Sequence, residues 1–564
     1  CVEVSRKVGG DDPHAPIVLK SRALRAGNTA RRVPQSTRPQ LFAYSLSRQT
    51  HINCRMRARN FPQYGGALWE AVRIPNSEIR NPSSDLGYGI TPTSTRRTSP
   101  MRRVVICLVV LWVSGSVFAE VEPLEVPIGE MVEGIACHTD PTQTYTLYIP
   151  STYTRGLRLP VLLIFDPRGR SLLAAELFRE AAETYGWIIV SSDNTRSDGS
   201  WEPNLLAIQA LWPEIHARIP ADFQRIYASG FSGGVAVATV LARTTGEIAG
   251  IIGCGGLNMV NQLDDRELPF FSTAGNTDFN FSEMNRLDDF LAEQGNPHRL
   301  VIFEGPHTWM PPEVARDAVE WMELNAMRRG TRDRDQGLIS RLYSADLEGA
   351  RSAVEDGQTL VAARRFREME RTYAGLHDTS EVKTVVDRIE AGDPYRLQLK
   401  KAKRIQGFED KCVERRNAEL TRLRSSDVPP PTAQLAGNLH IRDLLRDARE
   451  PDDQGFAAQR CLNSLYSSLS FYLPLDDLPK KRYAQVAASY ELALMIRDDY
   501  PVVWYNLACV RALLGQKKGA MEALEKAVEN GFRNTELLAS DTDLDPLRKR
   551  DDFKTLLGSL IGNQ

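Results

Sequence analysis

The pattern of hydrophobic and polar positions divides the chain into two regions of different periodicity. Between Val121 and about Arg329, short apolar runs alternate with longer stretches in which apolar residues recur at helical spacing. Beyond Gly330 the strand-like runs disappear, and Ala, Leu, Glu and Arg dominate at helical spacing. Alternation of strands and helices predicts a mostly parallel sheet covered by helices on both faces. The pattern therefore predicts an α/β domain over residues 120–330, followed by an all-α region.

The strands expected in the α/β domain are short runs rich in β-branched and aromatic residues. They cover residues 144–150, 160–165, 187–190, 225–229, 248–254, 269–274 and 299–303. The run 144–150 alternates like an antiparallel edge strand, whereas 160–165 is continuously apolar and suits a strand buried on both faces. The helices expected between them cover residues 174–185, 205–219, 235–242, 281–293 and 312–324.

The all-α region divides at the proline-rich stretch 428–431 and contains the signature of a helical repeat near its end. The positions that fit a tetratricopeptide helix pair are Trp504, Asn506, Leu507, Ala508, Gly515, Ala520, Leu524 and Ala527. One repeat length of about 34 residues earlier, Val486, Tyr490 and Ala493 occupy equivalent positions. We therefore expect tetratricopeptide-like repeats over residues 481–564. For residues 331–480, an ordinary helix bundle and a repeat are both open.

The first hundred residues differ from the rest of the chain in charge. Residues 1–100 contain 14 Arg, 2 Lys and 6 acidic residues, a net charge of +10 within a chain whose overall charge is −2. The arginines are dispersed and no sustained apolar pattern accompanies them, which argues against a nucleic-acid-binding arm. We expect this stretch to be a disordered or wrongly annotated upstream segment.

Residues 101–119 have the three-part layout of a secretory signal peptide. Met101 and two arginines precede an apolar run over 104–113, and small residues lead to a cleavage point after Ala119. The apolar run is too short to span a bilayer. We therefore expect Met101 to be the biological start, and the mature protein to be periplasmic or secreted, without a transmembrane anchor.

Eight cysteines are present, and none forms a Cys-x-x-Cys pair, which argues against a metal knuckle or a redox motif. Five of them, Cys137, Cys254, Cys412, Cys461 and Cys509, follow the expected signal peptide. A bridge between Cys412 and Cys461 is compatible with an oxidising compartment. The others are expected to be buried apolar residues.

The segment Gly230-Phe231-Ser232-Gly233-Gly234 joins an expected strand to an expected helix. A serine on such a sharp turn presents its hydroxyl group at the end of the sheet. The glycines are required because bulkier residues would collide with the neighbouring strand and helix. This arrangement makes Ser232 a candidate nucleophile.

A serine nucleophile needs a base, and the base needs an acid to orient it. In such sheets the partners follow in the order Ser, Asp or Glu, His, at the carboxyl ends of the strands. Asp278 follows the expected strand 269–274, and His307 follows the strand 299–303. Each has an alternative reading, because a loop Asp before a helix is often only a cap and many loop histidines have no catalytic role. The order and placement of all three predict a Ser232–His307–Asp278 triad.

The tetrahedral intermediate of acyl transfer also needs backbone N–H donors. The N–H group of Gly233, directly after the nucleophile, is one candidate. The second should come from the loop after residue 165, where Pro167 has no N–H group, so Arg168 or Gly169 must supply it. Asp166 is a rival acid by type, but its place before the nucleophile's strand favours a role in shaping the loop.

These residues together resemble the α/β-hydrolase superfamily, and in particular its secreted polyhydroxybutyrate-depolymerase-like and feruloyl-esterase-like members. The similar motifs are residues 222–234, Asp278-Phe279-Asn280, and Gly305-x-His307-x-Trp309, within residues 121–329. The resemblance implies an α/β-hydrolase fold with Ser232 as nucleophile, Asp278 as acid and His307 as base. The chain departs from many members at Asp166-Pro167, where they carry His-Gly.

The sequence therefore predicts an exported serine hydrolase that cleaves small or polymeric carboxylic esters, with no metal or organic cofactor. Peptidase activity uses the same triad and is open, although no propeller-like region precedes the hydrolase segment. The repeats are expected to bind a protein or peptide partner. The alternative is an interaction protein in which the hydrolase-fold domain is a non-catalytic scaffold.

Overall fold

The computed structural model describes residues 3–4, 19–20, 124–197, 199–256 and 267–562. Residues 3–4 and 19–20 form two short antiparallel strands, β1 (Glu3–Val4) and β2 (Leu19–Lys20). The expected signal peptide at 101–119 and nearly all of the basic segment 1–100 lie outside the described residues. Described residues of 126–215 and 220–564 belong to one compact unit.

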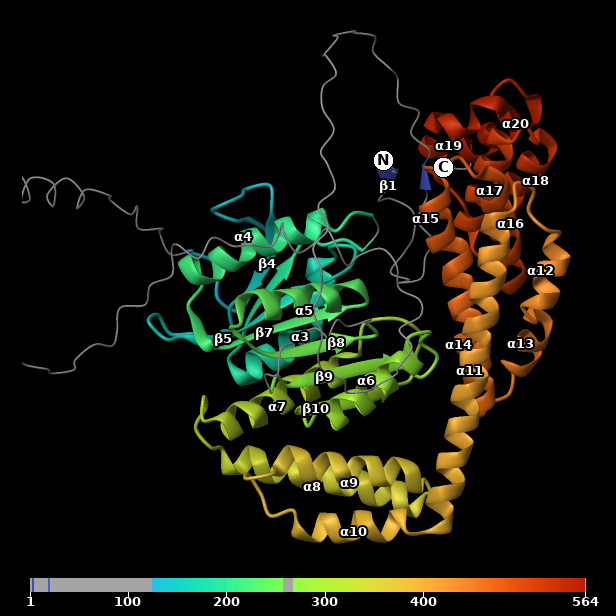
Figure 1. The fold of residues 1–564 in the computed structure, drawn as a ribbon. Coiled ribbons are helices and arrows are strands. Elements are labelled where there is room, and N and C mark those ends of the chain that lie inside the picture. The colour runs from blue at the N-terminus through green and yellow to red at the C-terminus, as the bar shows by residue number, and fades with distance from the viewer. Residues whose placement is uncertain (1–2, 5–18, 21–123, 198, 257–266, 563–564) are drawn as a thin grey trace, which may run out of the picture. The chain divides into compact units, whose positions relative to one another are not determined.

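The α/β region is built on an eight-stranded sheet with the order β10-β9-β8-β7-β5-β6-β4-β3 (Figure 1). Its strands are β3 (Met131–Ala136), β4 (Thr144–Tyr148), β5 (Leu159–Phe165), β6 (Ile188–Ser192), β7 (Ala221–Phe231), β8 (Ile248–Cys254), β9 (Phe270–Gly275) and β10 (His298–Phe303). The strands from β5 to β10 run parallel, and β3 and β4 pair antiparallel. The mostly parallel sheet predicted from the sequence is therefore present.

Strand β4 is antiparallel, as expected, but it is not an edge strand. It pairs with β6 on one side and with β3 on the other, so β3 forms the edge. The register of β3 shifts between Val132 and Ile135, around Gly134, whose φ is +68°. This irregularity interrupts the alternation of apolar and polar residues, which is why the pattern did not indicate a strand at 131–136.

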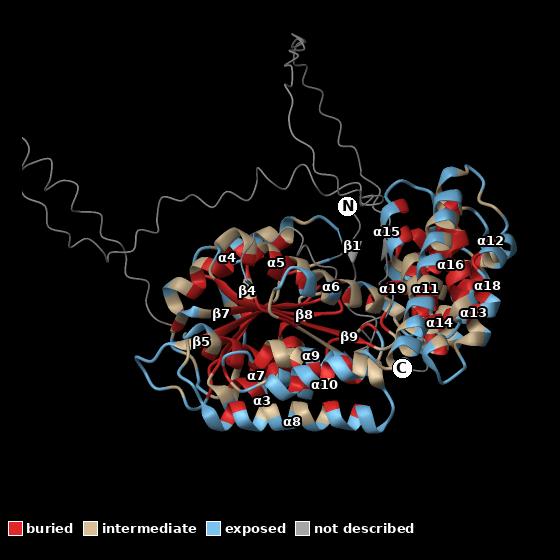
Figure 2. Cartoon of the chain, turned by 60° about the horizontal axis from the view of Figure 1, so that its bottom comes forward, coloured by how far each residue is buried: buried red, intermediate tan, exposed pale blue. Residues whose placement is uncertain are grey.

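Five helices cover the sheet in two layers. Helices α3 (Ser171–Tyr185) and α7 (Pro312–Arg329) pack against one face, and α4 (Glu202–Arg218), α5 (Gly233–Thr245) and α6 (Phe281–Glu293) cover the other, with the buried strands between them (Figure 2). The central strands are apolar on both faces, and every residue of β6, β8 and β9 is buried. The α/β fold class is therefore as predicted.

Beyond Arg329 every described element is a helix, in agreement with the loss of strand signals in the sequence. The helices are α8 (Gln336–Glu355), α9 (Thr359–Tyr373), α10 (Ser380–Glu390), α11 (Asp393–Ser425), α12 (Thr432–Asn438), α13 (Ile441–Asp447), α14 (Asp453–Ser467), η2 (Ser468–Tyr472), α15 (Leu473–Asp477), α16 (Tyr483–Ile496), α17 (Pro501–Leu513), α18 (Lys517–Glu529), α19 (Thr535–Ser540), η3 (Thr542–Leu547) and α20 (Asp551–Ile561). The proline-rich stretch separates α11 from α12. Within the described part of the chain, no helix is long and apolar enough to cross a membrane.

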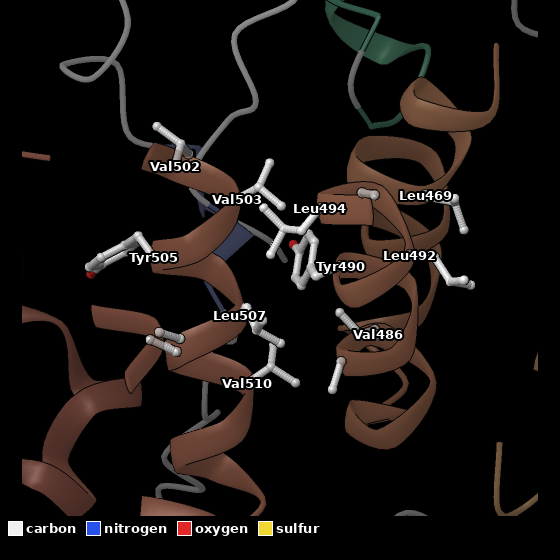
Figure 3. Packing of buried hydrophobic residues seen from close by; sticks show 14 of the residues in the cluster. Leu469, Val486, Tyr490, Leu492, Leu494, Val502, Val503, Tyr505, Leu507 and Val510 are labelled. Carbon is white, nitrogen blue, oxygen red and sulfur yellow. The ribbon is translucent and has the colours of Figure 1, made fainter. Parts of the chain in front are cut away.

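The end of the helical region is held together by close packing of consecutive helices. Tyr490 on α16 is fully buried and faces Val503 and Leu507 on α17 (Figure 3). Helix α17 begins with Pro501, whose fixed φ suits the first turn of a helix. Small residues such as Ala520 on α18 are fully buried, which permits the close approach that the repeat pattern requires.

Cys412 on α11 and Cys461 on α14 lie next to each other in the core of the helical region. They are not bridged, and the thiol groups are hydrogen-bonded to each other. This hydrogen bond, together with Arg415, lowers the pKa of the Cys412 thiol, although burial opposes the shift.

Candidate active site

Ser232 occupies a sharp turn between strand β7 and helix α5. Its φ is +51° and its ψ is −120°, a region that residues with a side chain rarely adopt. A Cβ atom on Gly230 would overlap the backbone of Gly234, and one on Gly234 would overlap the carbonyl oxygen of Phe165 in β5. The two glycines therefore allow the helix and the strand to approach closely enough to hold the serine in this conformation.

The structure brings Ser232, His307 and Asp278 together in one hydrogen-bonded row. The Nε2 atom of His307 lies 3.0 Å from Oγ of Ser232, and its Nδ1 atom lies 2.9 and 3.0 Å from the two carboxylate oxygens of Asp278. Asp278 is fully buried and His307 is only 6% exposed. When Nδ1 carries the ring proton and donates a hydrogen bond to Asp278, Nε2 is able to accept the proton of the serine hydroxyl.

These three side chains meet because they follow three parallel strands, β7, β9 and β10, at the same edge of the sheet. Ser232 follows β7, and Asp278 follows β9 in a short segment, residues 276–280, that we call the acid loop. His307 follows β10, which pairs in parallel with β9 over its whole length. Carboxyl ends of parallel strands lie together, so residues far apart in the chain converge here.

The carboxylate of Asp278 is held by Asn280, which the sequence placed in a motif without a role, and is bordered by Gly255, which the sequence did not indicate. The N–H group of Asn280 donates to Oδ1 of Asp278 at 2.7 Å, and Nδ2 of Asn280 donates to the carbonyl oxygen of Gly255 at 2.7 Å. Gly255 follows β8, and a Cβ atom there would crowd both Asp278 and His307. A glycine directly after a buried strand was the available signal in the sequence.

Aromatic rings hold the imidazole of His307 on two sides. The ring of Phe231 lies 4.6 Å from it and the ring of Phe279 lies 4.2 Å from it, centre to centre. Trp309 packs beneath, at right angles to Phe178 and tilted against Phe231. Trp309 is only 6% exposed, so it supports the loop of His307 and does not line an open pocket.

Asp166 organises the loop between β5 and α3. This fully buried carboxylate accepts hydrogen bonds from the side chain of Arg170 at 2.8 and 3.1 Å and from Nε1 of Trp309 at 2.8 Å. It thereby ties the loop to the segment that carries His307. The predicted loop-shaping role of Asp166 agrees with this geometry, whereas its contact with Trp309 has no signal in the sequence.

The three N–H groups expected as oxyanion donors differ in whether they already have an acceptor. The N–H group of Arg168 donates to Oδ1 of Asp166 at 2.8 Å, and that of Gly169 donates to the carbonyl oxygen of Asp166 at 3.1 Å. The N–H group of Gly233 belongs to the first residue of α5, where a helix provides no acceptor of its own. The loop N–H groups are therefore engaged within the loop in this structure, whereas that of Gly233 lies at the N-terminus of α5 directly after the serine.

Two further observations describe the surroundings of the site. Burial raises the pKa of the Cys254 thiol, at the end of β8, to about 12, so this thiol stays protonated near neutral pH. Among the residues that the structure describes, no group of three His, Cys, Asp or Glu side chains is arranged to hold a metal ion.

Comparisons with known proteins give only partial matches. No family model matches the chain. A chloroplastic protein of Arabidopsis thaliana is 38% identical over 60 residues, which cover 11% of this chain and 18% of that protein. The chain therefore spans less than a fifth of the curated relative that it matches.

Similar solved structures include three hydrolases. S-formylglutathione hydrolase of Staphylococcus aureus is 15% identical over 36% of this chain and 99% of its own, with a TM-score of 0.29. The esterase Est2 of Thermogutta terrifontis is 15% identical over 38% and 98%, with a TM-score of 0.29. Est1E of Butyrivibrio proteoclasticus is 14% identical over 35% and 98%, with a TM-score of 0.28. At these identities and TM-scores the similarity assigns no activity to this chain.

Proposed function

We propose that this protein is a serine hydrolase that cleaves carboxylic esters, with Ser232 as nucleophile, His307 as general base and Asp278 as the acid that orients it. The observation that carries the proposal is the hydrogen-bonded row from Ser232 through His307 to the buried Asp278. It is supported by the strained backbone of Ser232 at the turn between β7 and α5. Hydrogen bonding alone occurs at many buried sites, but its combination with this turn supports the assignment of Ser232 as a nucleophile.

In the proposed reaction, Oγ of Ser232 attacks the ester carbonyl carbon while its proton moves to Nε2 of His307. The tetrahedral intermediate collapses, and the leaving alcohol takes this proton from His307, which leaves an acyl group on Ser232. Water then attacks the acyl-enzyme with His307 again as base, and the carboxylic acid product is released from Ser232. Asp278 holds the imidazole ring and stabilises its positive charge at both steps.

The developing oxyanion is proposed to lie against the N–H group of Gly233. For Arg168 or Gly169 to supply a second donor, its N–H group must give up its hydrogen bond to Asp166 and donate to the oxyanion. The N–H group of Arg168 now donates to a carboxylate side-chain oxygen and that of Gly169 to a backbone carbonyl. A rotation of the peptide between Pro167 and Arg168 would release the N–H group of Arg168, and a rotation of the next peptide would release that of Gly169.

The wider interpretation of the chain is also a proposal. We infer that residues 481–564 act as tetratricopeptide-like repeats that bind a protein or peptide, because α16, α17 and α18 are short consecutive helices packed through buried small residues. Export to the periplasm or the medium rests on the sequence of residues 101–119 alone. Partner binding and export could each fail without affecting the esterase proposal.

A direct test measures hydrolysis of p-nitrophenyl acetate and butyrate by the full chain and by Ser232→Ala. Loss of the nucleophile should lower kcat by about 10⁴-fold or more, and it should abolish labelling by a fluorophosphonate. Ser340→Ala, at an exposed serine of α8, is the matched control and should behave like the unaltered protein. Equal turnover by Ser232→Ala would refute the assignment.

The second candidate function is a non-catalytic scaffold. The specific observation in its favour is that the N–H groups of Arg168 and Gly169 are already bonded to Asp166, which leaves one oxyanion donor in place. A scaffold predicts no fluorophosphonate adduct on Ser232 and no turnover of any p-nitrophenyl ester, so mass spectrometry of the labelled protein separates the two. Turnover of peptide p-nitroanilides in place of esters would indicate a peptidase.

A further inference from the structure

The acid loop forms hydrogen bonds in two directions. Its N–H groups face the α/β region, where Asn276 donates to the carbonyl oxygen of Phe303 at 2.8 Å and Thr277 to that of Gly305 at 3.0 Å. The N–H group of Asp278 donates to the carbonyl oxygen of Gly275, at the end of β9, at 3.1 Å. The carbonyl oxygens of the first two loop residues have partners elsewhere in the chain.

Those partners are two side chains of helix α14. Nη1 of Arg460 donates to the carbonyl oxygen of Asn276 at 2.7 Å, and Nδ2 of Asn463 donates to the carbonyl oxygen of Thr277 at 2.8 Å. The two donors lie three positions apart, on one face of the helix. The residues joined are 184 and 186 positions apart in the chain. A helix of the helical region thus holds the two residues directly before Asp278.

The guanidinium group of Arg460 is itself fixed by buried partners. Its Nε atom is paired with Glu409 of α11, and both residues are only 7% exposed. The same carboxylate accepts a hydrogen bond from the hydroxyl of Ser282 in α6. The guanidinium group also lies 4.2 Å above the centre of the Phe281 ring. Because a buried charge pair tolerates little displacement, Arg460 is a rigid donor.

The orientation of Asn463 is set by a second arginine. Nη2 of Arg497 donates to Oδ1 of Asn463 at 2.6 Å, which leaves the amide nitrogen of Asn463 facing the carbonyl oxygen of Thr277. Arg497 lies in the connection between α16 and α17, and its guanidinium group packs over the rings of Tyr466 and Tyr500. The hydrogen bonds therefore run from the predicted repeats to the acid loop through two side chains.

We propose that Arg460 and Asn463 are positioning residues for the esterase reaction, which align Asp278 by holding the carbonyl groups of the acid loop. This inference rests on the proposed function, because it gives Asp278 a task in catalysis. Neither side chain touches the serine or the imidazole ring, so both act through the backbone of the loop. The helical region then has a role in the active site as well as any role in binding a partner.

An alternative is that these contacts only join the helical region to the α/β region. A joining contact would affect the stability of the protein and leave the chemistry of each folded molecule unchanged. A positioning contact lowers kcat in the folded fraction, because small displacements of catalytic groups have large effects: about 1 Å can cost roughly 10²-fold in rate. The two readings therefore differ in kcat per active site.

The test uses the full chain with Arg460→Gln, Asn463→Ala and Arg497→Gln. We expect kcat for p-nitrophenyl butyrate to fall by roughly 10- to 100-fold, 3- to 10-fold and less than about 3-fold, respectively, with KM nearly constant. Arg460→Lys keeps the charge but not the fork of donors, so it should recover part of the lost kcat. Arg446→Gln, an exposed arginine paired with acids of its own helix α13, is the matched control.

Arg460→Gln also leaves Glu409 buried without its cation, which by itself destabilises a protein. The double variant Glu409→Gln/Arg460→Gln removes both charges and separates this effect from positioning. Rates are divided by the fraction of molecules that a fluorophosphonate labels at saturation. We expect the double variant to keep the low kcat of Arg460→Gln while it recovers thermal stability.

The pH profile supplies a readout that unfolding does not move. A displaced Asp278 carboxylate stabilises the protonated imidazole of His307 less, so the acidic limb of kcat/KM should move to lower pH. The titratable and charged groups near the acid loop are His307, Cys254 of β8, Tyr472 of η2, and Arg460 with its partner Glu409. Asn463→Ala changes none of these charges, so the shift of the acidic limb is read in that variant.

Hydrogen exchange gives a result that does not depend on activity. In Arg460→Gln and Asn463→Ala, peptides that contain residues 276–281 should exchange faster than in Arg446→Gln. Unchanged exchange in the acid loop would overturn the inference, and so would a wild-type kcat per labelled site. If Ser232→Ala retained full turnover while exchange still increased, the proposed function would fail but the anchoring of the loop by α14 would stand.

Discussion

The carboxyl edge of the sheet and the helical region use the same residue types for different purposes. At the sheet edge, Gly230 and Gly234 are placed where a Cβ atom would overlap neighbouring backbone. In the helical region, Gly515 has a φ of +75° at the end of α17, but nothing lies within 4 Å of the position a Cβ atom would take. Gly230 and Gly234 permit the close approach of helix and strands, whereas Gly515 permits only a positive φ.

Buried polar groups differ between the two regions in the same way. Around Ser232 they support the candidate active site, with Asp166 and Asp278 fully buried and each bonded several times. In the helical region a buried pair such as Tyr505 and Asp541 joins neighbouring helices. Substitutions at the sheet edge should therefore affect chemistry, and most substitutions in the helical region should affect stability alone.

The largest expected effect is that of Asp278→Asn on the reaction. An amide can hold the imidazole in the wrong tautomer and cannot stabilise its charge, so kcat should fall by about 10⁴-fold while the thermal midpoint changes little. Steady-state hydrolysis of p-nitrophenyl butyrate, together with a melting curve, measures both quantities. A loss of less than tenfold would mean that the sheet edge is not organised for this chemistry.

The next effect is a contrast between two identical substitutions, Gly234→Ala and Gly515→Ala. The first should destabilise the protein by more than about 4 kcal/mol, or prevent soluble expression, because the methyl group overlaps the carbonyl oxygen of Phe165. The second should cost about 1 kcal/mol, because only the left-handed φ opposes an alanine. Chemical denaturation compares them, and equal costs would remove the distinction between the two kinds of glycine.

A smaller effect is expected for Tyr505→Phe. The hydroxyl of Tyr505 donates to Oδ2 of Asp541 at 2.7 Å in the buried core, while its ring stacks on Phe532 at 4.4 Å. Removal of the hydroxyl keeps the stacking and leaves the carboxylate short of a donor, at a cost of about 1–3 kcal/mol. Turnover of p-nitrophenyl butyrate at 25 °C should stay unchanged, and a tenfold lower kcat would contradict the assignment of Tyr505 to stability alone.

The smallest effect concerns two buried cysteines, one in each region. The hydrogen bond with Cys461 and the nearby Arg415 lower the pKa of Cys412, whereas burial raises that of Cys254 to about 12. The Cys412 thiol therefore ionises at a lower pH than the Cys254 thiol. Mass spectrometry after brief exposure of the native protein to iodoacetamide should therefore find Cys412 modified first. Faster labelling of Cys254 would reverse this ranking.

Local patterns in the sequence were sufficient to predict the alternation of strands and helices up to Arg329, because each element there has a clear period. The positions of Ser232, Asp278 and His307 could be selected because each follows a strand. Strand β3 was missed because Gly134 and the register shift beside it break the period. The error about β4 followed from this, since a missing neighbour makes an inner strand look like an edge.

The supporting groups of the candidate site could not be predicted from local patterns. Asp166 contacts Trp309 over 143 positions in the chain, and Arg460 contacts the acid loop over 184. No periodicity links residues so far apart, and an arginine on a polar helix face usually indicates solvent exposure. These contacts depend on how the helices pack around the sheet, which only the tertiary structure specifies.

The backbone of Ser232 has a consequence for the evolution and engineering of this protein. A residue with a side chain at a φ of +51° and a ψ of −120° costs of order 1–3 kcal/mol, and glycine would relieve that strain. Ser232→Gly should therefore be more stable than the natural chain and incapable of forming an acyl-enzyme. Selection for thermal tolerance alone would favour this substitution, so under the proposed function only selection for turnover would retain the serine.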